Sequence, residues 1–328
     1  MLRAGLIGLG AMGRHHARLL RVSDAFEFVA AVDPDGDRHG ALVETPLLAS
    51  VDDLIERGVE LAIVAVPTAD HETIATVLAA ADVHTLVEKP LADSTESATR
   101  VAERFATSTA LGAVGHVERF NPALIELRRR LRENELGHVF SITTERVGPF
   151  PYRIQDVGVV KDLATHDIDI IMWLSKASIR MVSAQMAHQM GRNHEDLVTA
   201  VGKLSDGCVF RLDVNWLTPT KRRTVTVLGE RGAFVADLLS ADLTFYENAH
   251  VPTEWDAVAR LSGVSEGDMV RYAIPKPEPL RKELETFAAM IAGDSGAEIA
   301  TMEEGVEILR VAEAILRSAE SGGTEHTG

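Results

Sequence analysis

Residues 2–13 read Leu-Arg-Ala-Gly-Leu-Ile-Gly-Leu-Gly-Ala-Met-Gly, an apolar run that ends in spaced glycines. The run predicts a strand, and the helix-patterned stretch that follows completes a strand–turn–helix unit. Onward from this unit, short apolar runs alternate with amphipathic stretches as far as about residue 115. Continuous apolar strands between helices are typical of a parallel sheet covered on both faces, so we expect a doubly wound α/β domain over residues 1–118. The expected strands are 3–8, 26–32, 61–66, 85–87 and 111–115, and the expected helices are 12–22, 51–57, 71–81 and 94–106.

The three spaced glycines form the pattern GxGxxG between the first strand and the first helix. Gly8 permits the tight turn, Gly10 lets the backbone approach a pyrophosphate, and Gly13 lets the helix pack against the strand. Around Ala11 and Met12, the start of the helix offers amide groups and a positive dipole end to phosphate oxygens. The pattern in this setting predicts a dinucleotide site of the Rossmann type.

Asp33 ends the second expected strand. An acidic side chain there can accept hydrogen bonds from the adenosine ribose hydroxyls and repel a 2′-phosphate, which favours NAD over NADP. Arg38 and His39 lie close behind and weaken that preference. In the alternative interpretation, the glycines make only a turn and Asp33 only caps a loop.

After about residue 118 the pattern changes to consecutive strands with tight turns. We expect an α+β domain over residues 119–328, built on a large open mixed or antiparallel sheet. Alternating apolar residues in 208–216 and 224–228 predict an exposed apolar sheet face, and hence a homodimer or homotetramer. Lys221–Arg223 is expected in a surface turn, and the tail 321–328 is expected to fray. The other expected strands are 139–146, 198–204 and 233–237, and the expected helices are 122–133, 163–174, 280–292 and 302–319.

The composition limits the possible partners. The chain has 328 residues, with 33 Lys or Arg against 49 Asp or Glu, for a formal net charge of −16. Such a surface repels phosphate backbones and anionic lipid, so nucleic acid and membranes are not expected partners. Cys208 is the only cysteine, which excludes an intrachain disulfide and argues against a cysteine zinc site. Residues 61–66 are far too few to span a bilayer, and the start leaves no room for a signal peptide. We therefore expect a cytoplasmic protein without a metal.

A second motif, Glu88-Lys89-Pro90, follows the fourth expected strand. In a doubly wound sheet, ligands collect at the carboxyl edge of the strands. Lys89 is therefore placed to contact both the nicotinamide end of the cofactor and a substrate hydroxyl. Considered alone, the motif is more typical of a solvated turn.

A third motif, Asp162-Leu-Ala-Thr-His166, has helical spacing. A separation of four places both side chains on one helical face, where the carboxylate can orient the imidazole for proton transfer. A metal site with Asp167 and Asp169 is an alternative, but no further histidine or cysteine ligands lie nearby in the sequence. Considered alone, the motif is more typical of a helix cap at Asp162 and a partly buried histidine.

Together, the glycine turn, Glu88-Lys89-Pro90 and Asp162-x-x-x-His166 resemble the glucose–fructose oxidoreductase/inositol dehydrogenase (Gfo/Idh/MocA) family. Pro67-Thr68-x-x-His71 is similar to the family's pattern beside the cofactor. The resemblance implies that Lys89, Asp162 and His166 line the active site. It also implies that NAD contacts both motifs beside the sheet edge, Pro67-Thr68-x-x-His71 and Glu88-Lys89-Pro90.

A finer resemblance concerns the substrate. Gly115–Pro122, Arg146–Pro151, Asp156–Asp169 and Asn215–Thr220 are similar to the UDP-N-acetylglucosamine 3-dehydrogenase branch of the family. This resemblance implies oxidation of the C3 hydroxyl of that UDP-sugar or a related one.

Local cations are then needed for the sugar diphosphate, because the overall charge is negative. The candidate substrate-binding residues are Arg119, Asn121 and Arg153, with Arg222 a further candidate cation. The alternatives are an inositol or free-hexose dehydrogenase of the same family, and a non-catalytic dinucleotide sensor.

Overall fold

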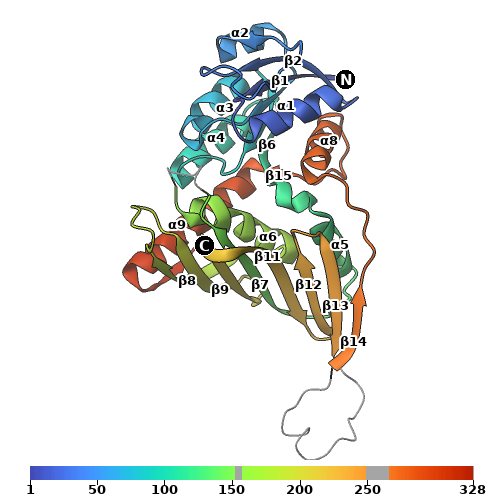
Figure 1. The fold of residues 1–328 in the computed structure, drawn as a ribbon, viewed down its shortest axis with the longest axis vertical. Coiled ribbons are helices and arrows are strands. Elements are labelled where there is room, and N and C mark those ends of the chain that lie inside the picture. The colour runs from blue at the N-terminus through green and yellow to red at the C-terminus, as the bar shows by residue number, and fades with distance from the viewer. Residues whose placement is uncertain (152–156, 249–265, 328) are drawn as a thin grey trace, which may run out of the picture. The chain divides into compact units, whose positions relative to one another are not determined.

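The computed structural model describes residues 1–151, 157–248 and 266–327 (Figure 1). The chain forms two compact units. Unit 1 comprises Met1–Val117 and Glu278–Glu313, and unit 2 comprises Glu118–Pro277 and Ala314–Gly328. In the part of the chain that the structure describes, no helix is long and apolar enough to cross a membrane.

Unit 1 contains a seven-stranded sheet in the order β15-β6-β5-β4-β1-β2-β3. All neighbouring strands pair in parallel except β15, which pairs antiparallel with β6. The strands are β1 (Leu2–Ile7), β2 (Phe26–Val32), β3 (Leu47–Leu48), β4 (Leu61–Val64), β5 (His84–Glu88), β6 (Gly112–Gly115) and β15 (Ala300–Thr301). The helices are α1 (Gly13–Val22), α2 (Val51–Glu56), α3 (His71–Ala80), α4 (Thr95–Ala106), α8 (Pro279–Ile291) and the first part of α9 (Met302–Ser321). This is the doubly wound sheet that the sequence predicts, and its strand order reverses at β1 and β4, where such sheets bind ligands.

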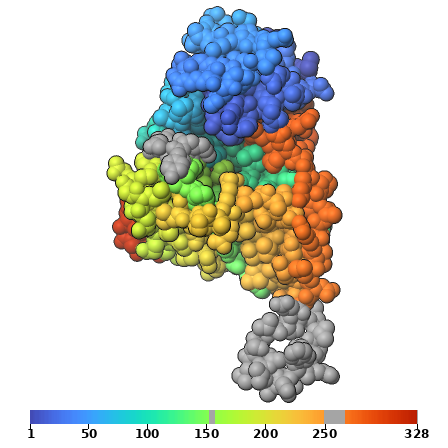
Figure 2. Space-filling model, viewed as in Figure 1, coloured from blue at the N-terminus to red at the C-terminus, as the bar shows by residue number. Residues whose placement is uncertain are grey.

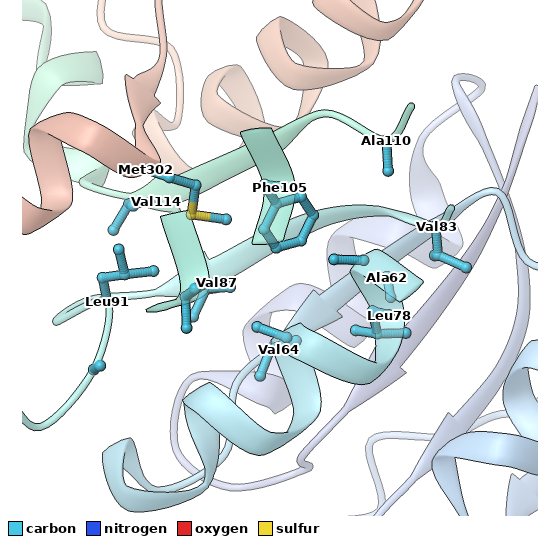
Figure 3. Packing of buried hydrophobic residues seen from close by; sticks show 14 of the residues in the cluster. Ala62, Val64, Leu78, Val83, Val87, Leu91, Phe105, Ala110, Val114 and Met302 are labelled. Carbon is cyan, nitrogen blue, oxygen red and sulfur yellow. The ribbon is translucent and has the colours of Figure 1, made fainter. Parts of the chain in front are cut away.

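The end of the chain does not belong entirely to the second unit, as the expected 119–328 domain implied. Residues 278–313 belong to unit 1, because Ala300, Met302, Val306 and Leu309 lie in its apolar core. Figure 3 shows Met302 beside Val114, so the returning segment completes the core at the β6 edge of the sheet. The expected domain boundary near residue 118 coincides with the division between the units.

Unit 2 is built on a nine-stranded sheet, counted over the described residues, in the order β14-β13-β12-β11-β7-β10-β9-β8-β16. The pair β7–β10 is parallel and the others are antiparallel, which confirms the mixed sheet. The strands are β7 (Val139–Pro149), β8 (Ile179–Ala187), β9 (Leu197–Leu204), β10 (Val209–Asn215), β11 (Leu217–Gly229), β12 (Gly232–Asp237), β13 (Asp242–Asn248), β14 (Glu266–Arg271) and β16 (Thr324–His326). The helices are η2 (Val117–Phe120), α5 (Pro122–Arg132), a π-helical turn η3 (Val160–Ala164), α6 (Thr165–Ser175) and the last part of α9.

The apolar alternation in the sheet marks its covered face and not the exposed one. Phe210, Leu212 and Val225 are 0% exposed and lie on the face that α5 and α6 cover (Figure 1). Their outward neighbours include the polar Arg211 and Thr226 and the exposed apolar Val209 and Leu228, so the open face is mixed. Most of the apolar residues in 208–216 and 224–228 are therefore covered, contrary to our expectation, and only Val209 and Leu228 of these two stretches are exposed. Figure 2 shows strand residues of this sheet, in yellow and orange, on the molecular surface.

Two further expectations for unit 2 are corrected. The tail does not fray throughout, because Thr324–His326 pairs antiparallel with β8. The Oγ of Ser318 accepts a hydrogen bond from the N–H of Ala184 at 2.9 Å, which holds the end of α9 beside the same strand. Lys221–Arg223 lies within β11 and not in a turn.

Candidate active site

The glycine turn between β1 and α1 requires its first and third glycines. Gly8 has φ +92°, and a Cβ there would lie 2.4 Å from the carbonyl oxygen of Ala65. A Cβ at Gly13 would lie 2.0 Å from the carbonyl oxygen of Gly8. Around Gly10, by contrast, a Cβ would meet nothing within 4 Å. The turn is thus closed against the protein and open on the side where Gly10 would let a pyrophosphate approach.

Asp33 follows β2 and is hydrogen-bonded to the same turn. Its Oδ2 accepts from the N–H of Leu9 at 2.7 Å, and its Oδ1 accepts from the N–H of Asp35 at 2.8 Å. The carboxylate therefore stays fixed beside the glycine turn, where a ribose would lie. The nearby Arg38 guanidinium pairs with Asp35 at 2.8 Å.

The start of α1 completes a site that fits NAD. Met12 is the N-cap residue, its side chain makes no capping hydrogen bond, and the first turn carries no acidic residue. The first amides of a helix have no partner within the helix, so Met12 and Gly13, with Ala11 just before the helix, would present N–H donors to a pyrophosphate. With Asp33 for the ribose hydroxyls, these residues would hold the dinucleotide.

Two segments at the carboxyl edge of the sheet are joined through His71. Pro67 and Thr68 follow β4, and His71 begins α3. The buried His71 ring lies between two backbone carbonyl oxygens, with Nδ1 2.9 Å from that of Pro90 and Nε2 3.1 Å from that of Val66. The two segments that the resemblance places beside the cofactor are thus connected in the structure.

Glu88 is the last residue of β5 and is buried. Its Oε1 lies 2.7 Å from Nε2 of His16 on α1. Burial opposes ionisation, but the hydrogen bond and charge of His16 and the charge of Lys89 hold the pKa of Glu88 below its usual value. Lys89 is half-buried, and its peptide bond to Pro90 is cis. Glu88 is therefore an ionised anchor beside Lys89.

In unit 2, Asp162 and His166 lie around the start of α6. Asp162 belongs to the π-helical turn, in which the N–H of Thr165 donates to the carbonyl of Val160, and His166 lies in the first turn of α6. The expected α-helix over 163–174 thus begins two residues later, after one wider turn. Such π turns are frequent at functional sites. Asp162 and His166 are both half-buried.

A group of charged side chains, here called the buried charge cluster, consists of Glu118, Arg146 and Asp167, which are buried, and of Arg223, whose side chain is 31% exposed. Arg146 donates to Glu118 at 2.8 Å and to Asp167 at 3.1 Å, and Arg223 donates to Glu118 at 3.4 Å. Burial raises the pKa of Asp167 to about 6 despite the neighbouring Arg146. Burial also opposes ionisation of Glu118, but Arg146 and Arg223 hold its pKa below the usual value. The cluster joins η2, β7, α6 and β11.

The candidate substrate-binding residues lie partly in the framework. Arg119 donates to Asp169 at 2.9 Å, and both side chains are buried. Asn121 caps α5, since its Oδ1 accepts from the N–H of Ala123 at 3.1 Å, and its amide donates to the carbonyl of Leu238 at 3.0 Å. Arg222 pairs with Glu145 at 2.9 Å, and Arg153 lies outside the described residues.

Sequence reasoning missed His16, Arg146, Asp167 and Arg223 as framework residues. The signal for Arg146 was available, because it shares one strand face with Ile142 and is therefore predicted to point inward. The alternative of a metal at Asp167 and Asp169 finds no support, because arginines already engage both carboxylates.

Comparison with known proteins agrees with this architecture. Residues 2–116 match the oxidoreductase family with an NAD-binding Rossmann fold, and residues 124–235 match the GFO/IDH/MocA C-terminal domain. The chain is 28% identical over 298 residues to the UDP-N-acetylglucosamine 3-dehydrogenase of Acidithiobacillus ferrooxidans, covering 89% of each chain. It is 29% identical over 344 residues to inositol 2-dehydrogenase 2 of Saccharopolyspora erythraea, covering 98% of this chain and 94% of that one.

Among solved structures, a UDP-N-acetylglucosamine 3-dehydrogenase from Acidithiobacillus ferrooxidans superposes with a TM-score of 0.86. Its sequence identity to this chain is 25%, and the match covers 98% of both chains. The chain therefore belongs to the GFO/IDH/MocA family of NAD(P)-dependent oxidoreductases.

Proposed function

We propose that this oxidoreductase oxidises a secondary hydroxyl of a sugar nucleotide, namely C3 of UDP-N-acetylglucosamine or of a closely related UDP-sugar. The observation that carries the proposal is similarity along nearly the whole chain to the dehydrogenase of Acidithiobacillus ferrooxidans, together with Lys89, Asp162 and His166. The similarity includes unit 2, the part of the chain in which the candidate substrate-binding residues lie.

We assign the chemistry to three side chains. His166 takes the hydroxyl proton, Asp162 orients the imidazole, and the Lys89 ammonium stabilises the negative charge that develops on the oxygen. Bound NAD supplies the hydride acceptor. Arg119 and Asn121 are proposed to affect substrate binding indirectly, through the contacts with Asp169 and Leu238 that they make. Arg153 is proposed to bind the substrate through its positive charge.

A second candidate substrate is a free polyol such as inositol. It is supported by 29% identity to the inositol 2-dehydrogenase of Saccharopolyspora erythraea over 98% of this chain. Such a substrate has no diphosphate, so its oxidation would not depend on the candidate cations Arg153 and Arg222.

The test follows reduced nicotinamide by absorbance while NAD is offered with UDP-N-acetylglucosamine, other UDP-sugars, myo-inositol and free hexoses. The expected result is turnover of a UDP-sugar with a kcat/KM at least tenfold above that for any free polyol. Preference for a polyol would support the second candidate. The absence of turnover on every substrate would contradict the assigned activity and favour a non-catalytic sensor.

Variants at the assigned side chains test their roles. Lys89→Ala and His166→Ala should fold and bind NAD, while turnover falls by about 10²–10⁴-fold for whichever residue carries the proton. A loss confined to His166→Ala identifies the histidine as the base, and a loss confined to Lys89→Ala identifies the lysine. If neither substitution changes kcat, the assignment of the site is wrong.

A further inference from the structure

The segment Glu88-Lys89-Pro90 is held on both sides of its lysine by buried histidines from two different helices. His16 belongs to α1 and His71 to α3, and both have exposures of at most 1%. Both contacts lie within unit 1, so the arrangement does not depend on unit 2.

On the first side, His16 holds the carboxylate of Glu88. Its Nε2 lies 2.7 Å from Oε1 of Glu88, and the other oxygen, Oε2, accepts from the backbone N–H of Lys89 at 3.3 Å. A buried carboxylate with two hydrogen-bonded oxygens has one orientation, because rotation would leave a charge unpaired. The backbone at Lys89 is therefore tied, through Glu88, to α1.

On the second side, His71 holds the carbonyl group of Pro90. The ring nitrogens lie 2.9 Å from the Pro90 oxygen and 3.1 Å from the Val66 oxygen. A neutral imidazole donates from only one nitrogen, and burial lowers the pKa of His71, so at neutral pH the ring makes one of these hydrogen bonds at a time. Either way the ring fills the space between the two carbonyl groups.

We propose that His16 and His71 are positioning residues that fix the Glu88-Lys89-Pro90 segment and thereby set where the Lys89 ammonium lies. Lys89 itself carries the chemistry, and the two histidines act only through it. This inference rests on the proposed role of Lys89 in oxidation. In this proposal, α1 has two roles. Its N-terminus faces the cofactor phosphates, and His16 anchors Glu88, which lies 72 residues away in sequence.

The first experiment measures the position of Lys89 without turnover. Lysines are acetylated with a limiting amount of acetic anhydride at pH 8, and mass spectrometry compares the labelling of Lys89 with that of the exposed Lys203. We expect His16→Leu and His71→Leu to change this ratio at least threefold. His16→Gln and His71→Gln retain an N–H donor near the same position and should stay within twofold of the parent protein. His15→Leu, on the exposed side of the same helix, is the matched control and should change nothing.

The second experiment is a double-mutant cycle on turnover with the best substrate found. His16→Leu should lower kcat by about 10- to 100-fold, as expected for a misplaced reacting group, while the dissociation constant of NAD stays within threefold. In a Lys89→Ala background the same substitution should cost less than twofold further, because there is no longer a lysine to position. If the role of His16 were purely structural, its substitution would lower kcat by the same factor in the parent protein and in Lys89→Ala.

The outcomes are separable. Unchanged Lys89 labelling in both leucine variants, with the melting temperature retained, overturns the proposal whatever the substrate. If the leucine variants do not fold, Glu88→Gln takes their place, because it keeps the shape and removes the charge that His16 holds. A changed labelling ratio in a protein that oxidises neither sugar nucleotides nor polyols would support the positioning role and contradict the proposed function.

Discussion

At the scale of single residues, Asp33 is hydrogen-bonded to the glycine turn, and we propose that it also binds the cofactor ribose. Its two oxygens already accept from the N–H groups of Leu9 and Asp35, so its charge is held where a ribose would bind. Asp33→Ala should raise the KM for NAD by about 10- to 100-fold, since a hydrogen bond to a charged group contributes roughly 1.5–3 kcal/mol. The KM for NADP should fall, because repulsion of the 2′-phosphate is lost. Steady-state kinetics with both cofactors check this.

Asp33→Asn is the matched control for the charge. Asparagine still accepts from Leu9, so the glycine turn should keep its shape while the repulsion of NADP disappears. Equal cofactor preference in Asp33→Asn and the parent protein would contradict the assignment to the ribose.

The residues that sequence reasoning identified share one property. Gly8, Asp33 and Lys89 are recognised by their immediate neighbours in the chain, which set a turn or the end of a strand. The contact between His16 and Glu88 joins residues from different elements, and no local pattern predicts which helix residue meets which strand end. The same holds for Arg119, whose partner Asp169 converts a candidate substrate cation into half of a buried ion pair.

At the scale of elements, the buried charge cluster ties η2, β7, α6 and β11 together, and it makes stability depend on pH. The pKa of Asp167 is raised to about 6 in the folded protein, above its ordinary value. As pH rises from about 4 to about 6, the unfolded chain therefore ionises first, and the free energy of unfolding falls through this group. Asp167→Asn should lack this decrease, which we expect to be on the order of 1–3 kcal/mol.

Urea unfolding of the parent protein and Asp167→Asn at pH 4.5 and pH 7 measures the difference. Asp268→Asn, at an exposed strand position, is the control and should follow the parent protein at both pH values. An identical pH dependence in Asp167→Asn and the parent protein would show that Asp167 ionises normally.

Element bounds were predictable where the hydrophobic pattern was clear, as in the nearly continuous apolar run of β2 (Phe26–Val32). Alternation of apolar and polar residues distinguishes the two faces of a strand, but it does not show which face a helix covers. For this reason the apolar side of β10 and β11 was assigned to the exposed face. The π-helical turn before α6 was not predictable either, because its wider turn depends on packing and not on residue type.

At the scale of the whole molecule, the chain returns to its first unit after building most of the second. The sequence does not show to which unit α8 and α9 belong, because an amphipathic helix has the same pattern whichever core it packs against. The decisive contacts are those of Met302 and its neighbours with the core of unit 1. The β16 strand, likewise, forms because an unpaired edge of β8 is available to a tail that is itself largely polar.

Association of copies is the remaining expectation, and we assign it to the outward face of the nine-stranded sheet. Exposed apolar side chains on that face include Val209 at 48%, Leu228 at 43% and Tyr246 at 46%. The register places Val209 and Leu228 on either side of Ser141, so they form one short apolar strip. We expect a homodimer or homotetramer whose copies meet over this strip, with polar contacts around it.

Light scattering at micromolar concentration tests this expectation. The double variant Val209→Glu/Leu228→Glu should be a monomer with an unchanged melting profile, whereas Ile125→Glu, at an exposed position of α5, should leave the assembly intact. Because each copy carries a formal charge of −16, the copies repel one another. Raising the salt concentration should therefore strengthen association, since screening acts over about 10 Å at 0.1 M ionic strength. A monomeric parent protein at high salt would contradict the expected association and leave the open face of the sheet as free surface.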